Sequence, residues 1–316
     1  MTDFSENAFQ TVQMVEIDVE RADQRIDNFL MTLLKGVPKS MVYRLLRTGQ
    51  VRVNKGRVKP PYRLQPGDII RVPPVRMPEK NQAQEPGRGM LERIERNIIF
   101  EDSGLIVLNK PSGIAVHGGS GISYGVIEAM RKLKPECKGL ELVHRLDRET
   151  SGCLLIAKKR SALRCLHESL RSGQVKKIYL ALCKGKWRGG ERLIDAPLRK
   201  NTVSSGERIV RVSADGKEAV SRFTPKQRFK MATLMEVELF TGRTHQIRVH
   251  AAFSEHPLAG DEKYGDKDFN RRMRGVGIKR LFLHAYQLKF TWNDSEFEIM
   301  SPLDDGLDTA LDNLNS

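Results

Sequence analysis

The chain has 316 residues, of which 39% are hydrophobic and 29% charged, so it can bury a sizeable core and is not a disordered protein. Its net charge of +15 points to a polyanionic partner. No apolar run reaches the length of a membrane span, and the N-terminal residues lack the basic and apolar regions of a signal peptide, so we expect a cytoplasmic protein.

The N-terminal part of the chain concentrates the positive charge. Residues 21–76 hold 13 Lys and Arg against 3 Asp and Glu, a net charge of +10, and residues 1–20 precede them as an extension. Apolar residues at helical spacing predict an amphipathic helix over residues 25–35. A second short helix up to Gly49 and a small basic hairpin with a turn at residues 54–56 are predicted to follow it.

Two short helices followed by a basic hairpin resemble the S4 domain, an RNA-binding module. The segment from RIDNFL to RLLRTGQVRVNKGRVKP carries this resemblance, over about residues 21–75. A merely solvated basic face is the alternative, but these charges accompany a compact helix pair and not a low-complexity tail, which favours nucleic acid. The predicted phosphate contacts are Lys39, Arg44, Arg47, Arg52, Lys55 and Arg57.

The rest of the chain is predicted to form a linker and a larger domain. Residues 77–92 are polar, contain Pro and Gly, and are expected to be the linker. Residues 93–316 contain many β-type runs separated by short turns, with helices predicted over residues 161–173 and after the turn TGRTH. We therefore predict an α+β domain built on a mixed, mainly antiparallel β-sheet with flanking helices.

The segment HRLDRETSG, residues 144–152, contains a single carboxylate, Asp147, between Arg145 and Arg148, just before a run typical of a buried strand. An Asp in such a turn is usually only a cap, and His144 is compatible with an ordinary core histidine. Three other polar segments that contain glycine favour function over that interpretation: NKPSGIAVHGG, TGRTHQIRVH and HPLAGDEKYG. The domain has no GxSxG motif, Cys–His spacing or Gly-rich phosphate loop that would indicate a different centre.

HRLDRETSG resembles the HRLDxxTSG motif of the RluA-type pseudouridine synthase family, and the three segments that contain glycine are similar to further motifs of that family. The resemblance covers about residues 93–305. It implies that uridine in RNA is isomerised: uracil leaves C1′ through N1, turns, and rejoins through C5. The reaction is redox-neutral, so no cofactor is expected. The resemblance also implies that the partner is large-subunit ribosomal RNA or its assembly precursor, and that the protein is a monomer without membrane contact.

The resemblance assigns roles to individual residues. Asp147 is the essential carboxylate, and Arg243 is expected to pair with it and keep it ionised. Tyr179 is expected to stack on the uracil and to take the proton from C5. Because the target base must leave its stack, Arg145 and the adjacent His144 are expected to contact RNA at that place. Whether Asp147 attacks C1′ or C6, or supports a glycal-type elimination, stays open.

Parts of the sequence are compatible with two other interpretations. The basic module alone would suit a binding protein such as a ribosome assembly factor, although such a protein has no need of the catalytic set. A hydrolase that uses Ser151 or a carboxylate would release free uracil, which a product assay detects. A metal site is not expected, because the cysteines contain no CxxC pair and His245 and His250 lie five residues apart.

Overall fold

The computed structural model describes residues 11–34, 36–75, 86–118, 124–202 and 208–315 of the chain. The chain divides into two compact units, Met1–Gln84 and Glu85–Ser316, and the described residues of each contain a hydrophobic core. Within the described residues, no helix is both long enough and apolar enough to cross a membrane.

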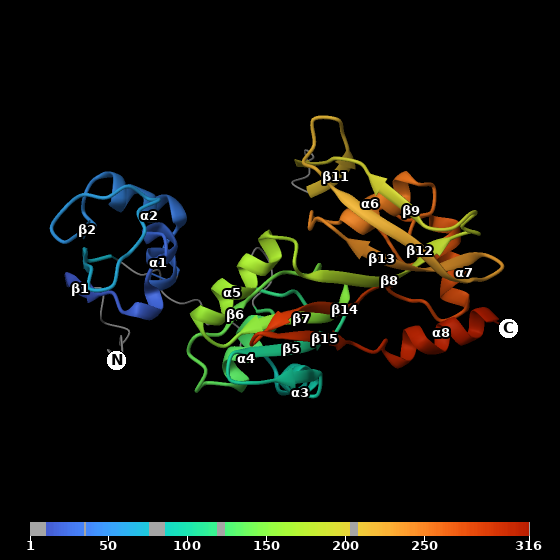
Figure 1. Cartoon of the computed structure of the whole chain (residues 1–316), viewed down its shortest axis with the longest axis horizontal. Coiled ribbons are helices and arrows are strands. Elements are labelled where there is room, and N and C mark those ends of the chain that lie inside the picture. The colour runs from blue at the N-terminus through green and yellow to red at the C-terminus, as the bar shows by residue number, and fades with distance from the viewer. Residues whose placement is uncertain (1–10, 35, 76–85, 119–123, 203–207, 316) are drawn as a thin grey trace. The chain divides into compact units, whose positions relative to one another are not determined.

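The small unit combines a helix pair with a three-stranded antiparallel sheet (Figure 1). In chain order its elements are β1 (Gln13–Glu16), a 3₁₀ turn (Val19–Arg21), α1 (Ile26–Leu33), α2 (Lys39–Arg47), β2 (Arg52–Val53) and β3 (Ile69–Val72). The apolar residues of α1 at helical spacing, Ile26, Phe29 and Leu30, are buried in the core. The predicted helix pair and basic hairpin are therefore confirmed.

The structure differs from the predicted extension and linker at two points. Strand β1 lies within residues 1–20, yet it pairs with β3 and buries Val15 in the core of the small unit. Helix α3 (Arg88–Glu95) begins inside the predicted linker over residues 77–92 and buries Ile94 in the core of the large unit. The four-residue strand β1 is too short to show apolar periodicity, and α3 begins directly after Pro86 and Gly87, so its first residues share the composition expected of a linker.

The large unit is built on a sheet of ten strands among the described residues. The strand order is β4-β5-β7-β14-β8-β13-β12-β9, with β6 paired to β7 and β15 paired to β14. Only the pairing of β7 with β14 is parallel, so the predicted mixed, mainly antiparallel sheet is confirmed. The strands are β4 (Ile98–Glu101), β5 (Leu105–Lys110), β6 (Glu141–Leu142), β7 (Ser151–Ala157), β8 (Lys176–Lys184), β9 (Arg192–Asp195), β12 (Val220–Arg228), β13 (Ala232–Leu239), β14 (Leu283–Trp292) and β15 (Ser295–Met300).

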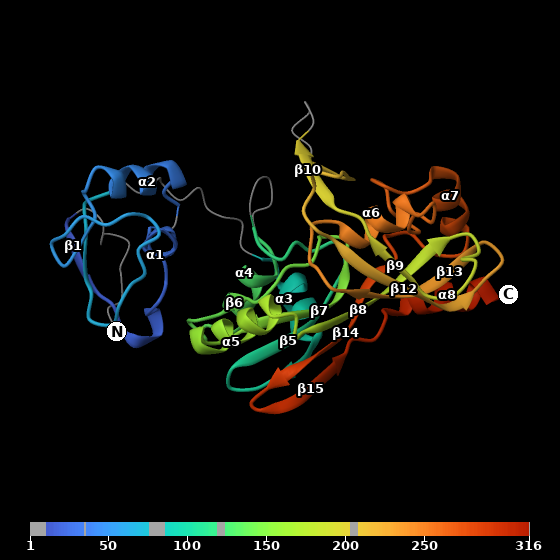
Figure 2. The ribbon, with the colours of Figure 1, turned by 45° about the horizontal axis from the view of Figure 1, so that its top comes forward.

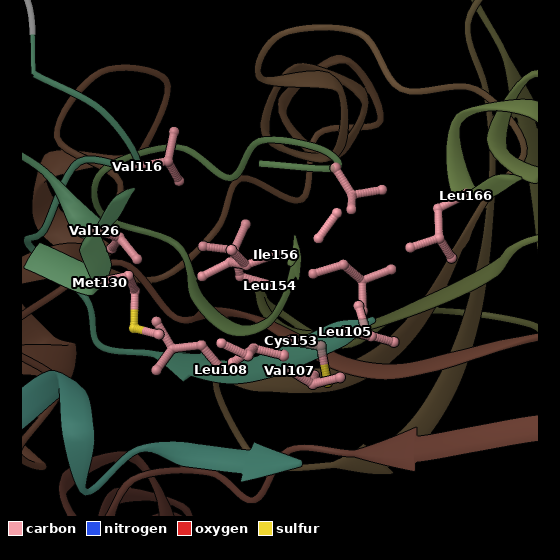
Figure 3. Packing of buried hydrophobic residues seen from close by; sticks show 14 of the residues in the cluster. Leu105, Val107, Leu108, Val116, Val126, Met130, Cys153, Leu154, Ile156 and Leu166 are labelled. Atoms are coloured by element: carbon pink, nitrogen blue, oxygen red, sulfur yellow. The ribbon is translucent and has the colours of Figure 1, made fainter. Parts of the chain in front are cut away.

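Helices flank the two halves of this sheet (Figures 1 and 2). The helices beyond α3 are α4 (Val126–Leu133), α5 (Arg160–Arg171), α6 (Gln246–Phe253), α7 (Lys267–Gly275) and α8 (Asp305–Asn315), and a separate hairpin consists of β10 (Leu198–Thr202) and β11 (Arg208–Val212). In the core of the first half, Val126 and Met130 of α4 and Leu166 of α5 lie around side chains of β5 and β7 (Figure 3). The second half has a core of its own, to which α6 contributes Ile247.

The centre of the sheet brings three distant segments into one row. Gly152 of β7 lies beside Ala285 of β14, and Tyr179 of β8 lies on the other side of Ala285. Gly152 has a φ of 108°, and a Cβ atom there would lie 2.3 Å from the carbonyl oxygen of Ala285. Only glycine permits this close approach, which places the loop of Asp147 next to the strand of Tyr179.

Candidate active site

Asp147 lies on the loop between β6 and β7 and faces an open pocket of about 110 Å³. The walls of the pocket come from this loop, from Tyr179 of β8 and from residues 242–247 at the start of α6. The side chain of Asp147 is 20% exposed, so a ligand in the pocket can reach it. The structure therefore brings together Asp147, Tyr179 and Arg243, all three of the predicted catalytic residues, around one cavity.

The cation that faces Asp147 is Arg248. Its Nη1 lies 3.8 Å from Asp147 Oδ2. The predicted ion pair between Arg243 and Asp147 is wrong, because Arg243 is exposed at the rim of the pocket and its Nε donates to the carbonyl oxygen of Glu218 at 2.8 Å. Arg243 precedes α6, whereas Arg248 lies in the first turn of this buried helix.

A second carboxylate holds Arg248 in place. Arg248 Nε and Nη2 donate to the two oxygens of Asp261, both at 2.7 Å, in the forked geometry that suits a guanidinium. Burial alone would lower the pKa of Arg248 and raise the pKa of Asp261. The hydrogen bonds and opposite charges of the pair outweigh burial, so the pKa of Arg248 is raised and that of Asp261 is lowered. The positive charge that faces Asp147 is thus permanent and fixed in position.

A histidine also faces the carboxylate of Asp147. His245 Nε2 lies 3.7 Å from Asp147 Oδ2, and His245 Nδ1 lies 2.8 Å from the hydroxyl oxygen of Tyr264. His245 occupies the N-cap position of α6 with a left-handed backbone, φ 55°, and its side chain makes no capping hydrogen bond. Burial lowers the pKa of His245, and the negative charge of Asp147 only partly opposes this effect. The imidazole is therefore neutral at pH 7.

Tyr179 lies in the wall of the pocket, where it was predicted, and packs against both hydrophobic cores of the large unit. Burial raises the pKa of its hydroxyl, and the charge of Asp147 adds to this effect. The phenol is therefore neutral at pH 7. A neutral phenol in an apolar wall suits stacking on a base better than the second predicted role, the removal of a proton.

The two residues predicted to contact RNA beside Asp147 have different surroundings. Arg145 is exposed and lines the pocket, so it is free to reach a nucleic acid. His144 is half-buried, and its Nε2 accepts a hydrogen bond from the backbone N–H of Leu155 at 3.1 Å. Burial lowers the pKa of His144 to about 4. This arrangement suits a neutral histidine that holds the loop to β7, and gives no support to the predicted RNA contact.

A buried lysine joins the loop of Asp147 to the segment NKPSGIAVHGG. Lys110 has no exposed surface, and its Nζ donates to the carbonyl oxygens of Pro111, Ile114 and Arg148 at 2.8 to 3.0 Å. The backbone N–H of Gly113 donates to the same Arg148 carbonyl at 2.9 Å. Burial lowers the pKa of Lys110 to about 7, while the three carbonyl oxygens match the three donors of its protonated form.

Replacing Lys110 with Met is expected to destabilise the large unit by about 3–5 kcal/mol, because the carbonyl oxygens of Pro111 and Ile114 lose their donor and that of Arg148 keeps only the N–H of Gly113. Urea unfolding at pH 7 measures this change in the free energy of unfolding. Lys138→Met is the matched control, because Lys138 is exposed on the loop that follows α4. Equal stability of the two variants would show that the lysine clamp contributes little.

The structure argues against a hydrolase that uses Ser151 as its nucleophile. The side chain of Ser151 is buried, and its Oγ lies 2.9 Å from His284 Nδ1 and 3.1 Å from Arg280 Nη2. Burial lowers the pKa of His284 to about 4. These contacts hold Ser151, the first residue of β7, in place, and a substrate cannot reach its buried hydroxyl. Among the described residues, no group of three or more His, Cys, Asp or Glu side chains could hold a metal ion.

The six predicted phosphate contacts of the small unit are all exposed. Three lie on α2 and three on the hairpin around the turn at residues 54–56. In the described part of the chain, none of the six lies within ion-pair distance of a carboxylate; they are Lys39, Arg44, Arg47, Arg52, Lys55 and Arg57. Their charges are available to an external anion, and their contact with phosphate stays a prediction.

The sequence reasoning missed four residues of the site: His245, Arg248, Asp261 and Tyr264. All four lie in two segments that were singled out, TGRTHQIRVH and HPLAGDEKYG. The available signal was the second arginine of TGRTHQIRVH. Which of its two arginines reaches Asp147 depends on where the helix begins, and the structure places that start at Gln246.

Comparison with known proteins identifies the family of the chain. Residues 104–253 match the model of the RNA pseudouridylate synthase family, and residues 24–70 match the S4 domain. The chain is 56% identical over 298 residues to ribosomal large subunit pseudouridine synthase C of Pasteurella multocida (strain Pm70), covering 93% of this chain and 91% of that protein.

Further relatives cover the chain to a similar extent. Identity is 53% over 311 residues to the protein of the same name from Escherichia coli (strain K12), covering 97% of this chain and 98% of the relative. The solved structure of human RNA pseudouridylate synthase domain containing 4 superposes with a TM-score of 0.61 at 26% identity, covering 72% of this chain and 96% of that one. The chain therefore belongs to the RNA pseudouridylate synthase family and carries an S4 domain.

Proposed function

We propose that this protein isomerises specific uridines of large-subunit ribosomal RNA, free or in an assembling particle, to pseudouridine. The observation that carries the proposal is the pocket in which Asp147 faces the fixed charge of Arg248, with Tyr179 in the adjoining wall. The S4 domain and the relatives named ribosomal large subunit pseudouridine synthase C support ribosomal RNA as the substrate.

The chemistry needs one reactive carboxylate and an apolar surface for a flipped base. The bond between C1′ and N1 breaks and a bond between C1′ and C5 forms, while C5 loses a proton and N1 gains one. Asp147 serves as the nucleophile or base of this exchange, and Arg248 faces it with a fixed positive charge that orients it. Tyr179 stacks on the uracil, and Arg145 contacts the RNA that the base has left.

The test uses ribosomal RNA that carries tritium at C5 of uridine. A synthase releases tritium to water and leaves the RNA chain with pseudouridine, without free uracil. Release of free uracil would identify an N-glycosidase, and binding without tritium release would identify a binding protein. Pseudouridine mapping in cells that lack the protein then locates the uridines.

We further infer that the protein works as a monomer in the cytoplasm. Asp147 and Tyr179 line one pocket within a single copy of the large unit, and Arg248 of the same copy faces Asp147, which supports a site that a monomer can complete. Sedimentation equilibrium of the purified protein, with and without RNA, tests this state. A stable dimer at micromolar concentration would contradict it.

The exposed cations of α2 are expected to set the salt dependence of RNA binding. Replacing Arg44 and Arg47 with Gln should reduce the slope of log affinity against log salt by about 1.4 to 1.8, since each phosphate contact contributes roughly 0.7 to 0.9. Binding is measured between 50 and 200 mM salt. The variant with Lys at both positions keeps the charge and should keep the slope. An unchanged slope in the Gln variant would show that α2 does not touch the RNA.

A further inference from the structure

The hydroxyl of Tyr264 connects a strand to the active-site histidine. Its oxygen accepts a hydrogen bond from the backbone N–H of Val210, in β11, at 3.0 Å. The same oxygen lies 2.8 Å from His245 Nδ1. A hydroxyl has one proton to donate, and among the described residues Nδ1 is the acceptor at hydrogen-bond distance from this oxygen, so the proton is assigned to that bond. His245 Nδ1 is then an acceptor, and the ring proton of the neutral imidazole is on Nε2.

The proton on Nε2 faces the reactive carboxylate. His245 Nε2 and Arg248 Nη1 lie 3.7 and 3.8 Å from the same oxygen of Asp147, Oδ2. These distances exceed a hydrogen bond, and such contacts commonly shorten when a substrate closes a site. Because both donors face Oδ2, the other oxygen, Oδ1, is left for the substrate.

The surroundings hold both rings in this arrangement. The guanidinium of Arg248 lies over the ring of Tyr264 at 5.1 Å, and the rings of His245 and Tyr264 meet edge to face at 5.5 Å. Asp261 Oδ1 accepts the backbone N–H of Tyr264 at 3.0 Å. His245 keeps a left-handed backbone that is uncommon for residues other than glycine, so its placement has a conformational cost.

We propose that His245 is a positioning residue of the reaction, which directs its Nε2–H at Oδ2 of Asp147, and that the Tyr264 hydroxyl selects this tautomer. The inference rests on the proposed synthase activity. Its consequence is that the two oxygens of Asp147 differ: Oδ2 is anchored by His245 and Arg248, and Oδ1 reacts.

The pH dependence of His245 follows from the groups around it. The loop before β7 contributes Asp147, α6 contributes Arg248, and the segment after α6 contributes Asp261, Lys263 and Tyr264. Burial is the largest cause that lowers the pKa of His245, and the two cations add to it, while the two carboxylates oppose them. The pKa of His245 is therefore lowered, and in the native protein the imidazole stays neutral at pH values at which a histidine ordinarily begins to take up a proton.

Tyr264→Phe removes the hydroxyl and keeps the ring. The single-turnover rate at pH 7 should fall about three- to tenfold, which corresponds to the loss of one hydrogen bond, with unchanged RNA affinity.

Without the hydroxyl of Tyr264 as its donor, Nδ1 of His245 takes up a proton more readily. A second full positive charge near Oδ2 makes Asp147 a weaker base, so the rate of this variant should fall more steeply than that of the native protein between pH 7.5 and 5.5. Nitrogen NMR of the imidazoles should show the Nε2–H tautomer of His245 in the native protein and should not show it in Tyr264→Phe.

A pair of amides separates positioning from folding. In His245→Gln the amide nitrogen reaches the place of Nε2 and can donate to Asp147, while in His245→Asn it reaches only the place of Nδ1. Asn tolerates the left-handed backbone better than Gln, so a purely structural role predicts that Asn is the better replacement. The positioning role predicts that Gln keeps the higher single-turnover rate.

The native protein is assayed in parallel for tritium release. If it releases none, the proposed synthase function fails. If it is active, two results overturn the role of His245 alone: a Tyr264→Phe variant with native rate and pH profile, or an Asn variant at least as active as the Gln variant.

Discussion

Asp147→Asn is expected to lower the single-turnover rate of pseudouridine formation by about 10⁴-fold or more, the range seen when an enzyme loses its reacting carboxylate. Asn keeps the size and polarity of the side chain but can act neither as a nucleophile nor as a base. The side chain is 20% exposed and, among the described residues, makes only long contacts with charged groups, at 3.7 and 3.8 Å, so the fold should tolerate the change. Tritium release from uridine labelled at C5 measures the rate.

The RNA affinity of Asp147→Asn should be equal to or slightly higher than that of the native protein, because a negative charge near the phosphates is removed. Glu149→Gln is the matched control. Glu149 lies two residues away on the same loop and pairs with Arg148 at 2.7 Å, outside the pocket lining. Its loss should leave the rate near the native value. An Asn variant with the native rate would remove Asp147 from the mechanism.

Arg248→Lys is expected to lower the single-turnover rate by about 100-fold, although it conserves the charge. A lysine cannot reproduce the two bonds of 2.7 Å to Asp261 while it also faces Asp147. A misplacement of about 1 Å in a reacting group is enough for a loss of this size. The rate is measured at saturating RNA, together with the thermal unfolding of the variant.

Arg243→Lys is the control for the arginine assignment. Arg243 is exposed at the pocket rim and its guanidinium bonds only a backbone carbonyl oxygen in the described part of the chain, so its exchange should change RNA affinity more than the rate. A large loss of rate in Arg243→Lys together with a native rate in Arg248→Lys would reverse the assignment. Equal losses would mean that both arginines act on the reacting groups.

The sequence alone predicted the division into two units, which the structure shows, and singled out Asp147 as the candidate carboxylate. The charge of residues 21–76 and the apolar spacing of α1 predict the basic helical module, because both are local properties of the chain. The alternation of strands and short turns predicts the mainly antiparallel sheet. Asp147 can be singled out from the sequence because the motif that contains it, HRLDRETSG, is one uninterrupted segment. The reason for the glycine of that motif lies in the tertiary structure, since Gly152 must allow Ala285 of β14 to approach.

Only the tertiary structure decided which groups surround Asp147. The choice between Arg243 and Arg248 depends on the residue at which α6 begins, and a shift of one residue turns a side chain by about 100° around a helix. The bond of Arg248 to Asp261 and the contact of Tyr264 with His245 join segments that no periodicity relates. Burial, which sets the neutral state of His245 and Tyr179, likewise arises only when both halves of the sheet close around the pocket.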